Sequence, residues 1–191
     1  VLISLFTCFV FSCFIHVTIA QAEELVSDGK GAILIEAQTG EILYDKNANE
    51  QLAPASMTKM MSMYLILEAI NNGSMQWDEV ICVSEHAASL GGSQIYLKPG
   101  EEMTVRDLFK SVAIASANDS VTALAERVAG TEEAFVQKMN EKAQEIGMYN
   151  THFSNVTGLD DENNYSTIED VAKMMNYARN NQTLKEIMSL K

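Results

Sequence analysis

The sequence predicts a mixed α/β (α+β) fold, in which a short hairpin is followed by several helices. Two patterns support this prediction. Near the start, two apolar stretches flank a Thr-Gly turn, and further along, apolar residues recur every three or four positions, as they do on one face of a helix. The chain has 191 residues, and the part that follows an apolar leader is long enough for one domain with a substantial core.

The hairpin comes first and a helix follows it. Strands are expected at 31–37 and 41–46, joined by a turn in which Gly40 serves the turn geometry. A lone hairpin is not stable in water, so its partner strands are expected beyond Lys191. The first helix is expected over 56–70, because its apolar residues repeat at helical spacing.

Four more helices are expected after an irregular stretch that ends near Gly100. Each is predicted from the same apolar spacing. Their expected ranges are 104–115, 119–129, 131–146 and 167–181. Ser166 and Glu169 have the spacing of a capping box, which predicts the start of the last helix.

The first 22 residues form an apolar leader with no Asp, Glu, Lys or Arg. Ala20 and Ala22 match the A-x-A site of signal peptides, so we predict a signal peptide over 1–22 and an exported mature chain that begins at Glu23. A membrane span is the alternative, since about 20 apolar residues can cross a bilayer. The charged start of a signal peptide is missing, and the chain opens on Val1, so we expect a fragment of a longer protein.

The composition disfavours several classes of function. The chain holds 26 acidic and 13 basic residues, and the net charge of −13 argues against binding to nucleic acid or to anionic lipid. The three histidines have no metal-binding spacing and no Gly-rich phosphate loop occurs, so the sequence predicts neither a metal site nor a phosphate-binding loop. Once the leader is removed only Cys82 remains, which excludes an intramolecular disulfide.

The most informative motif is a serine followed three residues later by a lysine, Ser56 and Lys59. The apolar repeat of the predicted helix places both on its buried face, where burial lowers the pKa of a lysine and leaves a neutral amine that can take the proton of the serine. The alternative makes Ser56 a helix cap and Lys59 a surface residue. A second S-x-x-K at 27–30 lies in a stretch without helical periodicity and is interpreted as a loop.

A second pair of polar residues, Ser116 and Asn118, lies at the junction of two predicted helices. Such a junction can direct a hydroxyl and a carboxamide into a cleft, and together with Ser56 and Lys59 the four residues are typical of a serine acyl-transfer site whose base is a lysine. The alternative is that Asn118 only caps the second helix.

With these motifs the chain closely resembles the low-molecular-mass penicillin-binding proteins that act as serine D-alanyl-D-alanine carboxypeptidases. The resemblance covers nearly everything after the leader. It is carried by residues 31–35, 39–44, 54–61, 116–120 and 123–126, and by Phe135, Met139, Asn140, Gly147, Met148, Thr151–Phe153, Thr157–Leu159, Tyr165–Thr167 and Asp170. It implies a β-lactamase/DD-peptidase-like sheet covered by helices on both faces, incomplete here because the C-terminal strands are missing. Residues 23–191 would then be the N-terminal part of the catalytic domain.

The resemblance also implies roles for the four polar residues. Ser56 would attack the carbonyl of the penultimate D-Ala in a peptidoglycan stem peptide, with Lys59 as general base. Ser116 would relay the proton to the leaving amine, and Asn118 would hold Lys59 and the substrate amide. No metal or organic cofactor would be required. β-Lactams would acylate Ser56 as mimics of the D-Ala-D-Ala substrate, at the outer face of the cell membrane, in the cell wall or in the periplasm. Any association with the membrane would come from the missing C-terminal region.

The departures from the family pattern leave alternatives open. The family's third motif, Lys-Thr-Gly, does not occur before the chain ends at Lys191. A class A β-lactamase is disfavoured, because the second motif is Ser-Ala-Asn and no Glu-x-x-Leu-Asn stretch is present. A DD-endopeptidase uses the same residues, and a non-catalytic penicillin-sensing or wall-binding module is the alternative of another class.

Overall fold

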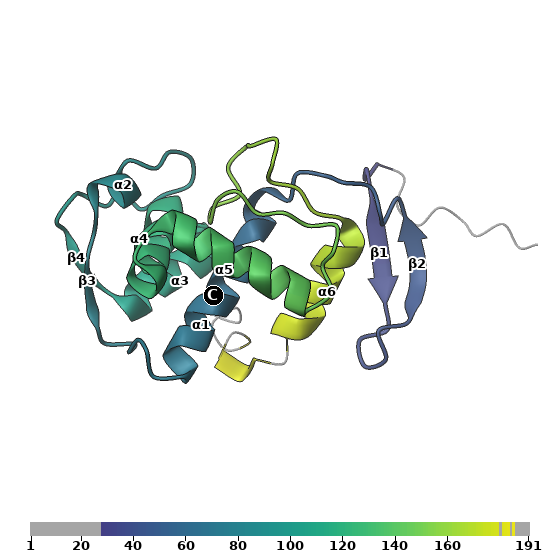
Figure 1. The fold of residues 1–191 in the computed structure, drawn as a ribbon, viewed down its shortest axis with the longest axis horizontal. Coiled ribbons are helices and arrows are strands. Elements are labelled where there is room, and N and C mark those ends of the chain that lie inside the picture. Colours follow the sequence, from purple (N-terminus) through teal and green to yellow (C-terminus); the bar gives the residue numbers. More distant parts are fainter. Residues whose placement is uncertain (1–27, 180, 184, 186–191) are drawn as a thin grey trace, which may run out of the picture.

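The computed structural model of the protein describes residues 28–179, 181–183 and 185 (Figure 1). They form a mixed α/β fold in which helices dominate and two small antiparallel sheets lie apart from each other. The elements are β1 (Ala32–Ile35), β2 (Ile42–Lys46), the 3-10 helix η1 (Ala55–Met57), α1 (Thr58–Asn71), β3 (Val80–Cys82), α2 (Glu85–Ala88), β4 (Glu102–Thr104), α3 (Val105–Ala115), α4 (Asn118–Ala129), α5 (Glu132–Glu145) and α6 (Ile168–Ala178). The predicted fold class is confirmed.

The predicted hairpin is present as strands β1 and β2, at one end of the molecule beside α6 (Figure 1). Gly40 adopts a φ of +76°, which is the left-handed conformation that glycine accepts without strain, so the turn assigned to it is confirmed. The carboxylate of Glu36 accepts hydrogen bonds from the backbone N–H groups of Gln38 and Thr39 and thereby closes the turn. The expectation of further strands beside this hairpin stays a prediction.

Helix α1 is the central element of the core, since α3, α4, α5 and α6 all pack against it. Met61, Ile66 and Leu67 on different sides of α1 are fully buried. Most of α1 is buried, and the face that carries Met60, Tyr64, Glu68 and Asn71 is partly exposed. The single buried face expected for this helix is therefore too narrow a description.

The stretch before Gly100 is more ordered than the sequence indicates. Strands β3 and β4 pair with each other, and the sequence between them contains α2, which Ser84 caps. Each strand has three residues and α2 has four, which is too short for a periodic pattern to be recognised. The prediction of an irregular segment is wrong at β3 and α2, while β4 lies just after that segment.

The last predicted helix begins one residue later than its capping box indicates. Thr167 is the cap of α6, and its side chain accepts the N–H of Asp170. Ser166 cannot take this role, because its backbone pairs with Leu52 in an isolated bridge.

Within the described part of the chain, every helix is too short or too polar to span a bilayer. The predicted signal peptide (1–22) lies outside the described residues and stays a prediction.

Candidate active site

Ser56 lies in the short η1 turn that leads into α1. The residue before it, Ala55, has a φ of +47°, a left-handed conformation that costs an alanine about 1–2 kcal/mol. Gly158 packs directly against this strained residue, since a Cβ added at Gly158 would lie 1.8 Å from the Ala55 carbonyl oxygen. The strain next to Ser56 is thus maintained by a close backbone contact with a distant part of the chain.

Lys59 points inward from the first turn of α1 and is only 3% exposed. Its Nζ lies 3.3 Å from Ser56 Oγ and donates a hydrogen bond of 2.6 Å to the carbonyl oxygen of Thr157. Burial lowers the pKa of Lys59 from 10.5 to about 8. At neutral pH roughly a tenth of such a lysine is a neutral amine, which can accept a proton from Ser56.

The structure confirms the predicted burial of Lys59 but not that of Ser56, which is exposed. Ser56 precedes α1 and lies in the η1 turn, so the apolar repeat of α1 does not extend to it. The cap of α1 is Met57, with no side-chain hydrogen bond, so Ser56 does not act as a cap. An exposed serine beside a buried lysine is open to a substrate on one side and to a base on the other.

A turn over residues 155–159 holds Lys59 from the opposite side, and the sequence did not indicate this role. The side-chain oxygen of Asn155 accepts the N–H groups of Thr157 and Gly158, which closes the turn and directs the Thr157 carbonyl at Lys59. Gly158 has a φ of +79°, and its missing Cβ permits the close contact with Ala55. A Thr-Gly pair after an Asn is a turn signal, but nothing local says that its carbonyl meets a lysine of α1.

Ser116 and Asn118 lie at the junction of α3 and α4, as predicted. Ser116 is half-buried, ends α3 and has a left-handed φ of +56°. Asn118 is the first residue of α4, 3% exposed, and its amide group donates to the Gly91 carbonyl at 2.7 Å. The cap of α4 is Ala117, so the alternative in which Asn118 only caps this helix is wrong.

The junction reaches the neighbourhood of Lys59 through packing of α4 against α1. In the described residues, neither Ser116 nor Asn118 forms a hydrogen bond with Ser56 or Lys59. The buried Oδ1 of Asn118 has no hydrogen-bond partner among them, which is unusual for a buried polar atom. Asp119, which the sequence did not single out, fixes the loop over the junction by accepting the N–H groups of Ile95 and Leu97.

The site combines an exposed serine, a buried lysine of lowered pKa and a serine–asparagine junction between two helices. This arrangement is typical of serine acyl-transfer proteins that use a lysine as the base. The profile of the D-alanyl-D-alanine carboxypeptidases of peptidase family S11 matches residues 17–191. The chain belongs to this family.

Curated relatives agree with the family assignment. D-alanyl-D-alanine carboxypeptidase DacF of Bacillus subtilis is 54% identical over 154 residues, which are 81% of this chain and 40% of the relative. D-alanyl-D-alanine carboxypeptidase DacC of Escherichia coli is 38% identical over 151 residues, which are 76% of this chain and 38% of the relative. The chain thus spans about two fifths of the length of these relatives.

Solved structures agree with the fold. The crystal structure of D-alanyl-D-alanine carboxypeptidase DacD from Francisella tularensis has a TM-score of 0.83 and 37% identity, over 87% of this chain and 40% of the other. Penicillin-binding protein D2 from Listeria monocytogenes, in its ampicillin-bound form, has a TM-score of 0.75 and 28% identity, over 84% of this chain and 65% of the other. The described residues therefore have the fold found in penicillin-binding proteins.

Proposed function

We propose that this chain supplies the nucleophile and the base of a serine D-alanyl-D-alanine carboxypeptidase, which removes the terminal D-Ala from peptidoglycan stem pentapeptides. One observation carries the proposal: an exposed serine lies 3.3 Å from a buried lysine whose pKa is lowered to about 8. The family assignment and the names of the relatives support the choice of substrate.

In the proposed reaction Ser56 Oγ attacks the carbonyl carbon of the penultimate D-Ala, and its proton passes to Lys59 Nζ. The N–H of Ser56 contributes one donor to the negatively charged oxygen that forms. The bond to the nitrogen of the terminal D-Ala then breaks, and that nitrogen receives a proton through Ser116. Water hydrolyses the resulting ester, which regenerates Ser56 and releases the shortened peptide.

The buried, unpartnered Oδ1 of Asn118 supports a binding role for this residue. Lys59 Nζ is the donor that we assign to it during turnover, together with the amide N–H of the substrate. A buried acceptor without a hydrogen bond costs about 1–3 kcal/mol. A substrate that supplies the missing donor removes this cost and is therefore bound more tightly.

β-Lactams are proposed to acylate the same serine. Attack of Ser56 on the ring carbonyl breaks the ring C–N bond, and the leaving nitrogen stays attached to the acyl group, which slows its replacement by water. The ampicillin-bound form of the Listeria protein shows that a structural relative holds a β-lactam. The signal peptide over 1–22 is proposed to direct the protein to the outer face of the membrane, where such substrates lie.

Release of D-Ala from a stem pentapeptide tests the proposal. The complete gene product that contains this sequence is incubated with a pentapeptide ending in D-Ala-D-Ala, beside its Ser56→Ala variant. Release by the former and not by the latter is expected. If the protein binds penicillin but does not release D-Ala, the proposed carboxypeptidase function is wrong and a penicillin-sensing module is the better assignment.

A further inference from the structure

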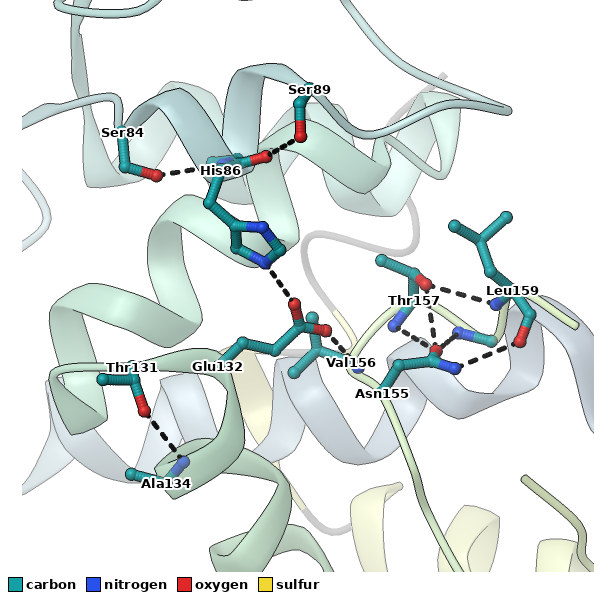
Figure 2. A network of polar contacts seen from close by, with 12 residues as sticks. Ser84, His86, Ser89, Thr131, Glu132, Ala134, Asn155, Val156, Thr157 and Leu159 are labelled. Atoms are coloured by element: carbon teal, nitrogen blue, oxygen red, sulfur yellow. Dashed lines mark hydrogen bonds and ion pairs between the residues drawn. The ribbon is translucent and has the colours of Figure 1, made fainter. Parts of the chain in front are cut away.

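A polar network outside the Ser56–Lys59 pair connects α2 to the back of the 155–159 turn (Figure 2). His86 Nε2 lies 2.6 Å from Glu132 Oε2. The other carboxylate oxygen of Glu132 accepts the N–H of Val156 at 3.1 Å. Three segments that are far apart in the sequence therefore meet at one carboxylate.

Glu132 is well placed for a role beyond the stability of its own helix. It is the first residue of α5, where Thr131 already caps the helix by accepting the N–H of Ala134. Its side chain is 13% exposed, and Figure 2 shows the carboxylate directed away from α5, between the His86 ring and the Val156 backbone. A carboxylate so far removed from water requires partners, and its partners lie outside α5.

The 155–159 turn is held on two sides. On the side of α1, the buried Ser62 donates from Oγ to the Val156 carbonyl at 2.8 Å, and Lys59 donates to the Thr157 carbonyl at 2.6 Å. On the other side, Glu132 accepts the N–H of Val156. Both polar groups of Val156 are thus fixed, and this sets the orientation of the next carbonyl, that of Thr157.

From this arrangement we infer that Glu132, itself oriented by His86, is a positioning residue for the catalytic lysine. It acts through Val156 and Thr157 and touches neither the substrate nor Ser56. The inference rests on the proposed function in one respect, namely that Lys59 is the base. Loss of the Glu132 carboxylate frees one side of the turn, moves the Thr157 carbonyl and admits water to Lys59 Nζ.

A purely structural role for Glu132 makes a different prediction. If it served only stability, its removal would lower the melting temperature and leave the pH dependence of acylation unchanged. If it positions Lys59, the pH dependence itself changes. Burial is what lowers the pKa of Lys59, so water at Nζ moves this pKa back up toward 10.5.

The test measures the second-order rate constant for acylation by a fluorescent penicillin between pH 6 and 10, in the complete gene product and its variants. Glu132→Ala is expected to lower this constant at pH 7 by about 10- to 100-fold, the scale of a displacement near 1 Å at a catalytic group. The pH of half-maximal rate is expected to rise above that of the parent. Glu132→Gln keeps an acceptor for Val156 and is expected to restore most of the rate.

Glu133→Ala is the matched control, because Glu133 lies in the same first turn of α5 and is exposed, and its carboxylate interacts with the Thr131 side chain and with the charge of His86 and not with the Val156 N–H, which Glu132 accepts. It removes an equal charge from the helix N-terminus and should leave rate and pH profile as in the parent. If Glu132→Ala has the same acylation rate and the same pH profile as Glu133→Ala, the inference is wrong. If Glu132→Ala does not fold, His86→Gln carries the test: the same upward shift supports the inference, and an unchanged profile refutes it. A parent that penicillin does not acylate would instead refute the proposed function.

Discussion

At the scale of single residues, the proposed chemistry depends on keeping Lys59 out of water. Lys59 lies beneath an exposed Ser56, and its amine contacts both the Ser56 hydroxyl and the Thr157 carbonyl. Only the neutral amine can accept the proton of Ser56. Burial lowers the pKa of Lys59, so packing around α1 produces near neutral pH some of the neutral amine that the proposed reaction requires.

The pH dependence of acylation follows from this pKa. Lys59 is protonated and inactive as a base well below pH 8, and it becomes neutral as the pH rises through about 8. The acylation rate constant should therefore increase with pH and reach half its maximum near pH 8. A stopped-flow titration with a chromogenic β-lactam measures it, and a rate that does not change between pH 6 and 9 would contradict the assignment of the base.

Replacement of Lys59 by arginine separates charge from basicity. Lys59→Arg retains the positive charge, but a guanidinium stays protonated at all accessible pH values and cannot take the serine proton. We expect acylation to fall by at least about 100-fold, the lower range for loss of a general base. Acylation at near-normal rate in a folded Lys59→Arg variant would exclude lysine as the base.

At the scale of elements, the site depends on the close contact between the η1 turn and the 155–159 turn. Gly158 has a φ of +79° and its missing Cβ leaves room for the Ala55 carbonyl, 1.8 Å from where that carbon would lie. Gly158→Ala combines backbone strain with a clash against main chain that cannot rotate away. We expect it to lower the free energy of unfolding by more than about 3 kcal/mol.

Gly73→Ala is the control for that substitution. Gly73 has a φ of +81° and nothing within 4 Å of an added Cβ, so only conformational strain, about 1–2 kcal/mol, is expected there. Urea unfolding of both variants gives the comparison. Equal losses at the two positions would show that the contact with Ala55 does not hold the site.

The pair between α2 and α5 makes stability depend on pH. The hydrogen bond that His86 Nε2 donates to the Glu132 carboxylate raises the pKa of His86 above its ordinary value of 6.5. Because the folded-state pKa is the higher one, the stabilisation is fully present below about pH 6.5 and is lost as the pH rises through the raised pKa. The melting temperature of the parent should exceed that of His86→Gln most at low pH, and a difference that grows with pH would contradict the pairing.

At the scale of the whole molecule, the sequence predicts what depends on local patterns and misses what depends on contacts between distant segments. The hairpin and the helices α3, α4 and α5 follow from turn residues and apolar spacing. The burial of Lys59 also follows, because it lies within the apolar repeat of α1. The exposure of Ser56 does not, since the chain changes from a 3-10 turn to an α-helix just after it.

The partners of the site are the part that could not be predicted. Thr157 is 98 residues from Lys59 along the chain, and Val156 is 24 from Glu132. No periodicity connects such positions, so the local sequence Asn-x-Thr-Gly predicts a turn but not its contact with Lys59. The unpartnered Oδ1 of Asn118 likewise could not be predicted, because it depends on which side chains pack around Asn118 in the folded chain.

In the proposed reaction Ser56, activated by Lys59, forms a covalent acyl-enzyme. Peptide mapping by mass spectrometry after brief exposure of the complete gene product to penicillin tests it most directly. The peptide that contains Ser56 should gain the mass of the intact penicillin, since ring opening adds the whole molecule, and Ser56→Ala should show no modified peptide. Modification at another residue, or persistent modification in Ser56→Ala, would contradict the assignment of Ser56 as the nucleophile.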